Sequence, residues 1–271
     1  MLSSRLVIDI SVLCYAASLV LLFVDAIQPR RAVNRTALVL LFLVFVAETF
    51  VLLHRLQTSG AVPVYTSFDV MLLLSWLILL VAVVVNTFFR IDLVLFFANA
   101  LGFAIVVFDA FAHVGRVVYT ARQGDVLVLH ITCAILSYAA FSFAFVFSIM
   151  YLVQDKFLRE KRWNRMYLRL PSLERLDTYA FRSILVGFPF LLIAMILGAI
   201  WGKLTLGRFL FMDPKPLATT LLWMMYGVYL ILRLRSGWGT SKLIWYNVIC
   251  FTGVIVNFVV IGSFSLFHHT L

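Results

Sequence analysis

"VLHITCAILSYAAFSFAFVFSIMY", residues 128–151, is an apolar run that contains no Asp, Glu, Lys or Arg. About 20 mostly apolar residues suffice to cross the hydrocarbon core of a bilayer as a helix, so the run predicts a span over 125–152. Small residues recur along it at steps of four, three, four and four: Cys133, Ser137, Ala140, Ala144 and Ser148. Such a stripe lets neighbouring helices approach closely. This span is therefore expected to be central in a helix bundle.

Similar runs recur along the whole chain. Only 13% of the 271 residues are charged, against about 25% in soluble domains. The runs are continuous rather than alternating, which favours helices over a barrel. We predict an all-α polytopic integral membrane protein, a single membrane domain over 1–271 with eight transmembrane helices. The expected spans are 5–27, 36–55, 66–89, 93–112, 125–152, 177–200, 217–233 and 243–266. The first is expected to be a retained span, because no small-residue cleavage site precedes the next charged loop.

The loops on the two sides of the membrane differ in basic residues. One set of loops holds 14 Lys and Arg residues and the other holds 7. Cytoplasmic loops are the ones enriched in cations, so both termini are expected to be extracytoplasmic. The same rule accounts for the net charge of +10 without nucleic acid. The three cysteines lie inside spans and form no CxxC or CxxCH motif, so neither a thiol redox site nor covalent haem attachment is expected.

The one sizeable cytoplasmic loop, 153–176, mixes cations with apolar residues such as Trp163 and Tyr167. One interpretation is an interfacial segment on the lipid bilayer, held by anionic headgroups. The other is a docking surface for a cytoplasmic protein. Loops of this kind usually only fix topology, which favours the first interpretation.

All five histidines fall at the predicted outer face of the membrane. His54 and His113 end spans, where an imidazole is tolerated at the headgroup level. His130 is different, because apolar residues flank it inside a span, and it needs a carboxylate, a backbone carbonyl or a metal as partner. The chain's final pair, His268 and His269, closes the eighth expected span.

Three kinds of site could use these histidines. A zinc or copper site would need more ligands in patterns such as HExxH, which this sequence lacks. A proton relay would need carboxylates through the membrane, and the inner half has almost none. Haem needs two axial imidazoles, apolar walls and cations for its propionates, and it fits best.

The loop predicted over 201–216, "WGKLTLGRFLFMDPKP", supplies the remaining elements of such a site. Trp201, Phe209 and Phe211 can cover a flat ring. Three cations can meet carboxylates: Lys203, Arg208 and Lys215.

This loop, followed by "LLWMMYGVYLILR" at 221–233, resembles the tryptophan-rich WWD segment of the cytochrome c assembly proteins of the CcsA and CcmC type. Within that family, three further stretches look like the HemX group of bacterial membrane proteins: 129–158, 161–177 and the ending "SLFHH". The resemblance implies eight spans in the bacterial cytoplasmic (plasma) membrane. It also implies lowering of the amount of glutamyl-tRNA reductase, the entry enzyme of haem synthesis.

The family likeness implies non-covalent haem b between His130 and His268, with His269 as the alternative to His268. It implies that Asp213 and Pro214 mark the covering segment. The chain departs from the family pattern at Pro216, where an acidic residue is expected, and at Ile231, where the family has the histidine of a deeper haem. These departures favour a regulator of haem synthesis that is not an enzyme.

Two alternatives stay open. One is a haem-delivery component of cytochrome c assembly, and the other is a scaffold without cofactor. For the regulator, the implied partner is glutamyl-tRNA reductase, or a protease or adaptor acting on it, at loop 153–176.

Overall fold

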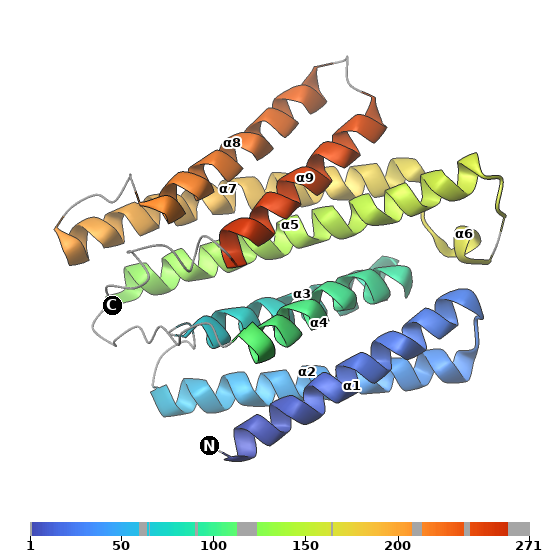
Figure 1. The fold of residues 1–271 in the computed structure, drawn as a ribbon, viewed down its shortest axis with the longest axis horizontal. Helices are drawn as coiled ribbons and strands as arrows, with labels where there is room; N and C mark the ends of the chain where they lie inside the picture. The colour runs from blue at the N-terminus through green and yellow to red at the C-terminus, as the bar shows by residue number, and fades with distance from the viewer. Residues whose placement is uncertain are drawn as a thin grey trace. The chain divides into compact units, whose positions relative to one another are not determined.

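The computed structural model describes residues 2–59, 64, 66–89, 92–112, 124–163, 165–207, 213–235 and 239–259. Across these ranges the chain forms nine helices and no strand, which confirms the all-α prediction for this part of the chain. The helices are α1 (Leu2–Ile27), α2 (Arg31–Ser59), α3 (Ser67–Phe89), α4 (Asp92–Ala112), α5 (Gly124–Arg159), α6 (Arg165–Arg169), α7 (Leu173–Leu206), α8 (Pro214–Leu234) and α9 (Thr240–Val259) (Figure 1).

Seven of these helices are long and apolar enough to cross a membrane: α1, α2, α3, α5, α7, α8 and α9. The chain is therefore a multi-pass membrane protein. The apolar part of α4, Leu93–Phe108, is shorter than those seven. The eighth crossing and the side of the termini thus stay predictions.

Two helices run well past their predicted ends. α5 continues through the charged residues to Arg159, and α7 continues to Leu206. A helix need not stop at the edge of the apolar run, because its backbone hydrogen bonds are satisfied internally in water as well as in lipid. As a result, Trp201 and Lys203 lie on a helix, whereas the sequence predicted a loop for them.

The described helices form two compact units, where the sequence predicts one domain. The first comprises Met1–Pro63, Phe68–His113 and Val153–Ser172. The second comprises Val64–Ser67, Val114–Leu152 and Leu173–Leu271.

In the first unit, α1 and α2 form a helical hairpin, and α3 packs on α2. The Ser18 hydroxyl donates to Ala37 O at 3.2 Å across the hairpin. The Trp76 indole stacks on Phe45 and donates its N–H to Thr49 Oγ1 at 2.8 Å. Small and aromatic residues thus set the contacts between these helices.

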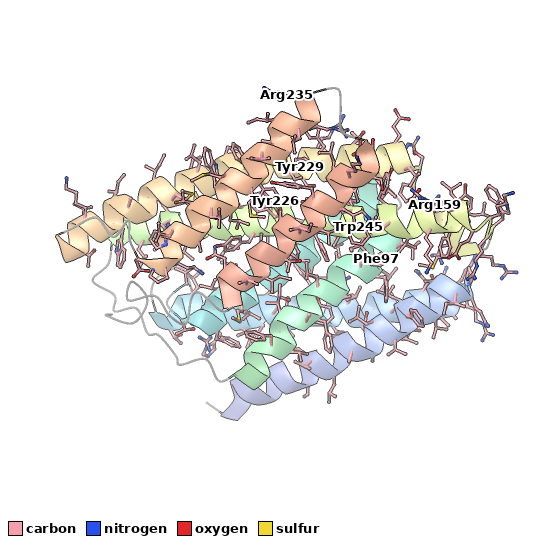
Figure 2. The ribbon with its side chains drawn as sticks, turned by 45° about the horizontal axis from the view of Figure 1, so that its top comes forward. Phe97, Arg159, Tyr226, Tyr229, Arg235 and Trp245 are labelled. Carbon is pink, nitrogen blue, oxygen red and sulfur yellow. The ribbon has the colours of Figure 1, made fainter. Side chains whose placement is uncertain are left out.

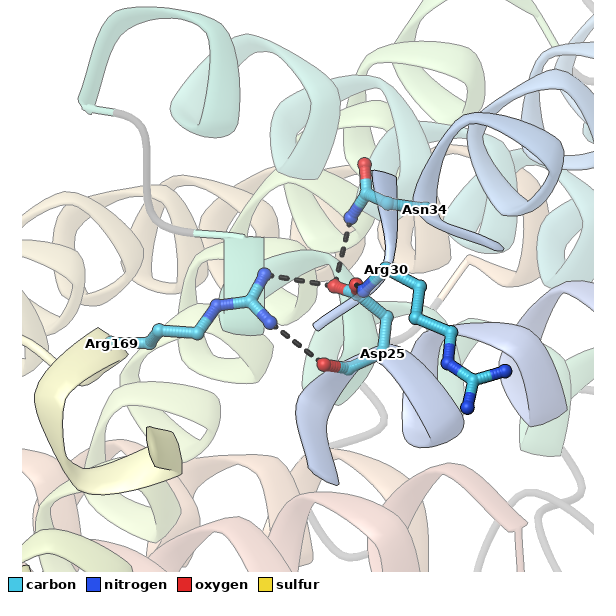
Figure 3. A network of polar contacts seen from close by, with 4 residues as sticks. All are labelled: Asp25, Arg30, Asn34 and Arg169. Atoms are coloured by element: carbon cyan, nitrogen blue, oxygen red, sulfur yellow. Dashed lines mark hydrogen bonds and ion pairs between the residues drawn. The ribbon is translucent and has the colours of Figure 1, made fainter. Parts of the chain in front are cut away.

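Asp25, near the end of α1, holds the short helix α6 to the α1–α2 turn (Figure 3). Its carboxylate accepts from the Arg30 backbone N–H at 3.0 Å and from Asn34 Nδ2 at 3.0 Å. Arg169 donates from Nη2 to the same carboxylate at 2.9 Å and from Nη1 to Asp25 O at 2.8 Å. We call these four residues the Asp25 clamp. The clamp fixes one end of the loop predicted to be cytoplasmic.

In the second unit, α5 and α7 lie side by side in opposite directions (Figure 1). Ser137 Oγ donates to Gly187 O at 2.9 Å, and Phe147 lies 5.3 Å from Tyr179 between ring centroids. From the first contact to the second, the residue number rises on α5 and falls on α7, so the two helices are antiparallel.

α5 also packs against α8 and α9 in this unit. Phe141 stacks on Tyr226 of α8, with centroids 3.8 Å apart and planes 2° apart; Figure 2 marks Tyr226 and Tyr229 on α8. Asn247 of α9 donates from Nδ2 to Ser148 Oγ at 2.8 Å. The small-residue stripe therefore carries two interhelical hydrogen bonds, through Ser137 and Ser148, and α5 is central within this unit as predicted.

Candidate functional site

The His130 imidazole, one turn into α5, has a backbone partner on α7. Its Nδ1 lies 2.6 Å from Ala194 O. A carbonyl oxygen can only accept, so Nδ1 carries the proton and Nε2 of the neutral ring carries the lone pair. Of the three partners that the sequence left open, the structure has the backbone carbonyl. Such a contact fixes both the tautomer and the orientation of a metal-binding imidazole.

Gly198 makes room for this imidazole on the surface of α7. A Cβ added at Gly198 would lie 2.8 Å from Cε1 of His130 and 2.9 Å from its Nδ1. Both distances are shorter than real Cβ contacts allow. The Cε1–Nδ1 edge of the ring thus lies against α7 at Gly198, one turn after the Ala194 carbonyl that the ring bonds. The sequence contained a signal for this residue, because Gly198 and Gly202 form a GxxxG motif, but the motif is too common in membrane helices to single it out.

Trp201 lies about one turn beyond Gly198 on α7, and its side chain is 1% exposed. Its indole packs with Leu127, and the partly buried Val126 and Ile131 adjoin this pair. The side chain therefore supports the turn of α5 that carries His130. Lys203, in the last turn of α7, is exposed.

The Asp213-Pro214 pair begins α8. Asp213 is the N-cap residue, and its Oδ1 accepts from the Lys215 backbone N–H at 3.1 Å. Pro214 occupies the first helical position, where its missing N–H would be unbonded in any residue. Asp-Pro is therefore a helix-start signal in this chain, whatever else it does.

Lys215 projects from the first turn of α8 towards α9. Its Nζ donates to Asn257 O at 2.6 Å, and it is close enough to His130 for an electrostatic interaction. Among the described residues no carboxylate forms an ion pair with Lys215. Asn257 in turn donates from Nδ2 to Thr219 Oγ1 at 3.1 Å. A cation held by a neutral acceptor can still receive an anionic group.

The structure thus gathers His130, Trp201 and Lys215 in the second unit, together with Ala194 and Gly198, which sequence reasoning missed. Four predicted site residues lie outside the described residues: Arg208, Phe211, His268 and His269. Phe209 lies outside them as well. His54, at the end of α2, is exposed, in line with the interfacial interpretation. The described part of the chain contains no cluster of three or more His, Cys, Asp or Glu suited to a metal ion.

The described residues offer one imidazole whose Nε2 carries the lone pair and one ammonium group in the same unit. Ile231, which stands where the family pattern has its deeper histidine, is 54% exposed on α8. Its aliphatic side chain cannot ligate iron. The described residues therefore provide ligand chemistry near His130 and none at Ile231.

A model of the cytochrome c assembly protein family matches residues 64–269, most of the chain. The chain belongs to the cytochrome c assembly protein family.

Within that family, the chain is similar to Protein HemX of Brevibacillus brevis, with 35% identity over 266 residues and 97% of each chain covered. It is 32% identical to Protein HemX of Bacillus subtilis (strain 168) over 267 residues, which cover 95% of each chain. A cytochrome c biogenesis protein CcsA from Chlamydomonas reinhardtii is 27% identical over 199 residues, which cover 70% of this chain and 55% of that protein. The likeness to HemX proteins predicted from the sequence is confirmed.

Proposed function

We propose that this protein is a haem-binding regulator of haem biosynthesis in the bacterial plasma membrane and that it performs no catalysis. In this proposal, haem b binds non-covalently at the outer face of the second unit. His130 supplies one axial ligand, and His268, or His269 in its place, supplies the other. When bound, haem supplies an iron that takes imidazole nitrogen and an absorption spectrum that reports its ligands.

The observation that carries the proposal is the hydrogen bond from His130 Nδ1 to Ala194 O. It leaves Nε2 as the only ring nitrogen able to bind iron, and it holds the ring in one orientation. A half-buried histidine could make this bond for packing alone. However, packing alone does not account for a lysine in the same unit whose ammonium group has, among the described residues, only a carbonyl acceptor.

Lys215 is the cation best suited to meet a haem propionate. Its ammonium group belongs to the second unit, as His130 does, and it is held there by the uncharged Asn257 carbonyl. Lys203 and Arg208 are further candidates for the propionates. Trp201, Phe211 and the Asp213-Pro214 start of α8 are assigned to the wall of the site.

The ligand assignment is tested with the absorption spectrum of the purified protein. We expect the wild type to show a Soret band and His130→Ala to lose or shift it. His54→Ala is the matched control, since it removes an exposed imidazole from the end of α2, and its spectrum should equal that of the wild type. An unchanged Soret band in His130→Ala would remove this residue from the ligand set.

The regulatory part of the proposal concerns the level of glutamyl-tRNA reductase. The segment 153–176, fixed at one end by the Asp25 clamp, is the proposed contact for that enzyme or for a protease or adaptor acting on it. Site occupancy can influence such a partner only if haem binds two conformations of the protein with different affinity.

Membership of the cytochrome c assembly family favours a second candidate function, haem delivery to cytochrome c assembly. Deletion of the chain separates the two. Loss of a regulator should raise glutamyl-tRNA reductase and leave c-type cytochromes intact. Loss of an assembly component should abolish those cytochromes. The absence of a histidine at Ile231 favours the regulator.

A further inference from the structure

A buried polar cluster lies in the first unit, away from the haem site proposed above. Its members come from four helices: Tyr15 of α1, Glu48 of α2, Ser75 of α3 and Asn99 of α4. Each is at most 4% exposed. The Ser75 hydroxyl donates to Glu48 Oε1 at 3.0 Å, and the Tyr15 hydroxyl donates to Asn99 Oδ1 at 3.2 Å. We call these four residues the Glu48 cluster.

The backbone is shaped to admit this cluster. A Cβ added at Gly102 of α4 would lie 2.5 Å from the Tyr15 hydroxyl. Only glycine therefore allows that hydroxyl to reach its place between the helices. Gly102 O also lies 3.4 Å from Ser75 Oγ, which brings a second acceptor to the cluster.

Glu48 differs from every other carboxylate that is buried among the described residues. Asp25 pairs with Arg169 at 2.9 Å, Asp69 pairs with Arg55, and Asp177 pairs with Arg233. The fourth, Asp213, accepts from a backbone N–H at the start of α8. Glu48 has a single hydroxyl donor, and in the described part of the chain no cation faces it from α1, α3 or α4.

An ionised carboxyl group without a counter-charge is very costly inside hydrocarbon, and such a group neutralises instead. Oε1 of Glu48 already accepts from Ser75, whereas Oε2 has no hydrogen-bond partner among the described residues. We infer that Glu48 is a proton-binding site, held as the neutral carboxylic acid with its proton on Oε2.

Among the side chains that the structure describes in this cluster, Glu48 is the one carboxyl group. Of the described groups, Tyr15 of α1 and Ser75 of α3 face Glu48, and Asn99 of α4 accepts from the Tyr15 hydroxyl. None of them is a second carboxyl group that could pass the proton on. The ligand is therefore one proton, held within the helix bundle and exchangeable with water only when the bundle opens.

Infrared difference spectroscopy of the full chain in lipid bilayers tests this inference. A protonated carboxyl group gives a carbonyl stretching band apart from the amide and carboxylate bands, and the band shifts in heavy water. We expect the wild type minus Glu48→Gln difference to contain one such band. Asp177→Asn is the matched control, because the Asp177 carboxyl forms an ion pair with Arg233, and it should remove no carbonyl acid band.

Two further arms keep the inference falsifiable if Glu48→Gln folds poorly. Gly102→Ala should shift the frequency of the same band, since it displaces the Tyr15 hydroxyl from the cluster. Sodium chloride compared with choline chloride should leave the band unchanged. Loss of the band in sodium alone would make the occupant Na⁺ and overturn the proton assignment. Absence of the band from the wild type would overturn it as well, because Glu48 would then be ionised.

Discussion

Substitutions at two glycines of α7 can distinguish an effect on His130 from an effect on helix packing. A Cβ at Gly198 would displace the His130 ring, whereas a Cβ at Gly187 would lie 2.7 Å from the Phe141 ring. The two positions thus impose the same kind of steric conflict on one helix, and only one of them touches the proposed ligand.

We predict that Gly198→Ala lowers haem affinity about tenfold or more, equivalent to about 1.4 kcal/mol. The displaced imidazole would lose its alignment with Ala194 O and therefore its fixed direction for Nε2. Titration of the purified protein with haem measures the change. Gly187→Ala should lower the melting temperature and leave haem affinity within error. Equal haem affinity in the wild type and Gly198→Ala would contradict the proposed ligand.

Two substitutions of Asp213 can likewise distinguish its role as a helix cap from a role of its negative charge. As the N-cap of α8 it accepts the Lys215 N–H, and losing such a cap costs about 1 kcal/mol. We predict that Asp213→Ala lowers the melting temperature, while Asp213→Asn, which keeps an accepting oxygen, stays near the wild type. Thermal unfolding in detergent compares the three proteins. If Asp213→Asn is as unstable as Asp213→Ala, the negative charge matters beyond the cap.

Among the elements, the Asp25 clamp controls how α6 is held. Hydrogen bonds to charged groups contribute about 1.5–3 kcal/mol each, and the side chains of Arg169 and Asp25 are 22% and 6% exposed. Loss of either partner should therefore release α6 from the α1–α2 turn. The segment before it carries many trypsin targets, including Lys161 and Arg162.

We predict that Arg169→Gln speeds tryptic cleavage within 153–172 several-fold, since cleavage follows the population of the opened segment. Limited proteolysis with mass spectrometry gives the sites and rates. Arg159→Gln is the matched control, because its ion pair with Asp155 is exposed and lies within one helix. Equal cleavage of the wild type and Arg169→Gln would show that other contacts hold the segment.

The helices differ in how far the sequence could predict them. The long apolar runs predicted α5 and its central place, since the steps between small residues place them on one face. The extensions to Arg159 and Leu206 were missed because hydropathy reports the membrane and not the end of the helix. The bond between Asp25 and Arg169 joins residues 144 positions apart, and no local pattern encodes such a contact.

The candidate site was partly predictable in the same sense. His130 was visible as an imidazole among apolar neighbours, and Lys215 as one of three cations after the sixth span. Gly198 could have been found by aligning the fifth and sixth spans in antiparallel register, in which position 130 meets position 194. That register follows from packing between helices, for which hydropathy carries no information.

For the whole molecule, the arrangement of charges predicts which side each loop occupies. We expect alkaline phosphatase fused after residue 271 to be active, because the C-terminus should be extracytoplasmic, and a fusion after residue 163 to be inactive. Enzyme assays on intact cells measure both, with green fluorescent protein fusions as the opposite reporter. Activity of the fusion at 163 would show that the predicted orientation is inverted. Inactivity of the fusion at 271 would show that the chain crosses the membrane one time fewer than predicted.

The polar contacts of α9 also bear on how the chain is made. Asn247 bonds Ser148 across 99 positions, and Asn257 bonds the Tyr138 hydroxyl across 119. Both partners on α5 are synthesised long before α9 leaves the ribosome. During that interval their hydroxyl groups must rely on water, on their own backbone or on the insertion machinery. The second unit can therefore complete its interior only after α9 has been synthesised, so a chain released before that point would be exposed to membrane proteases.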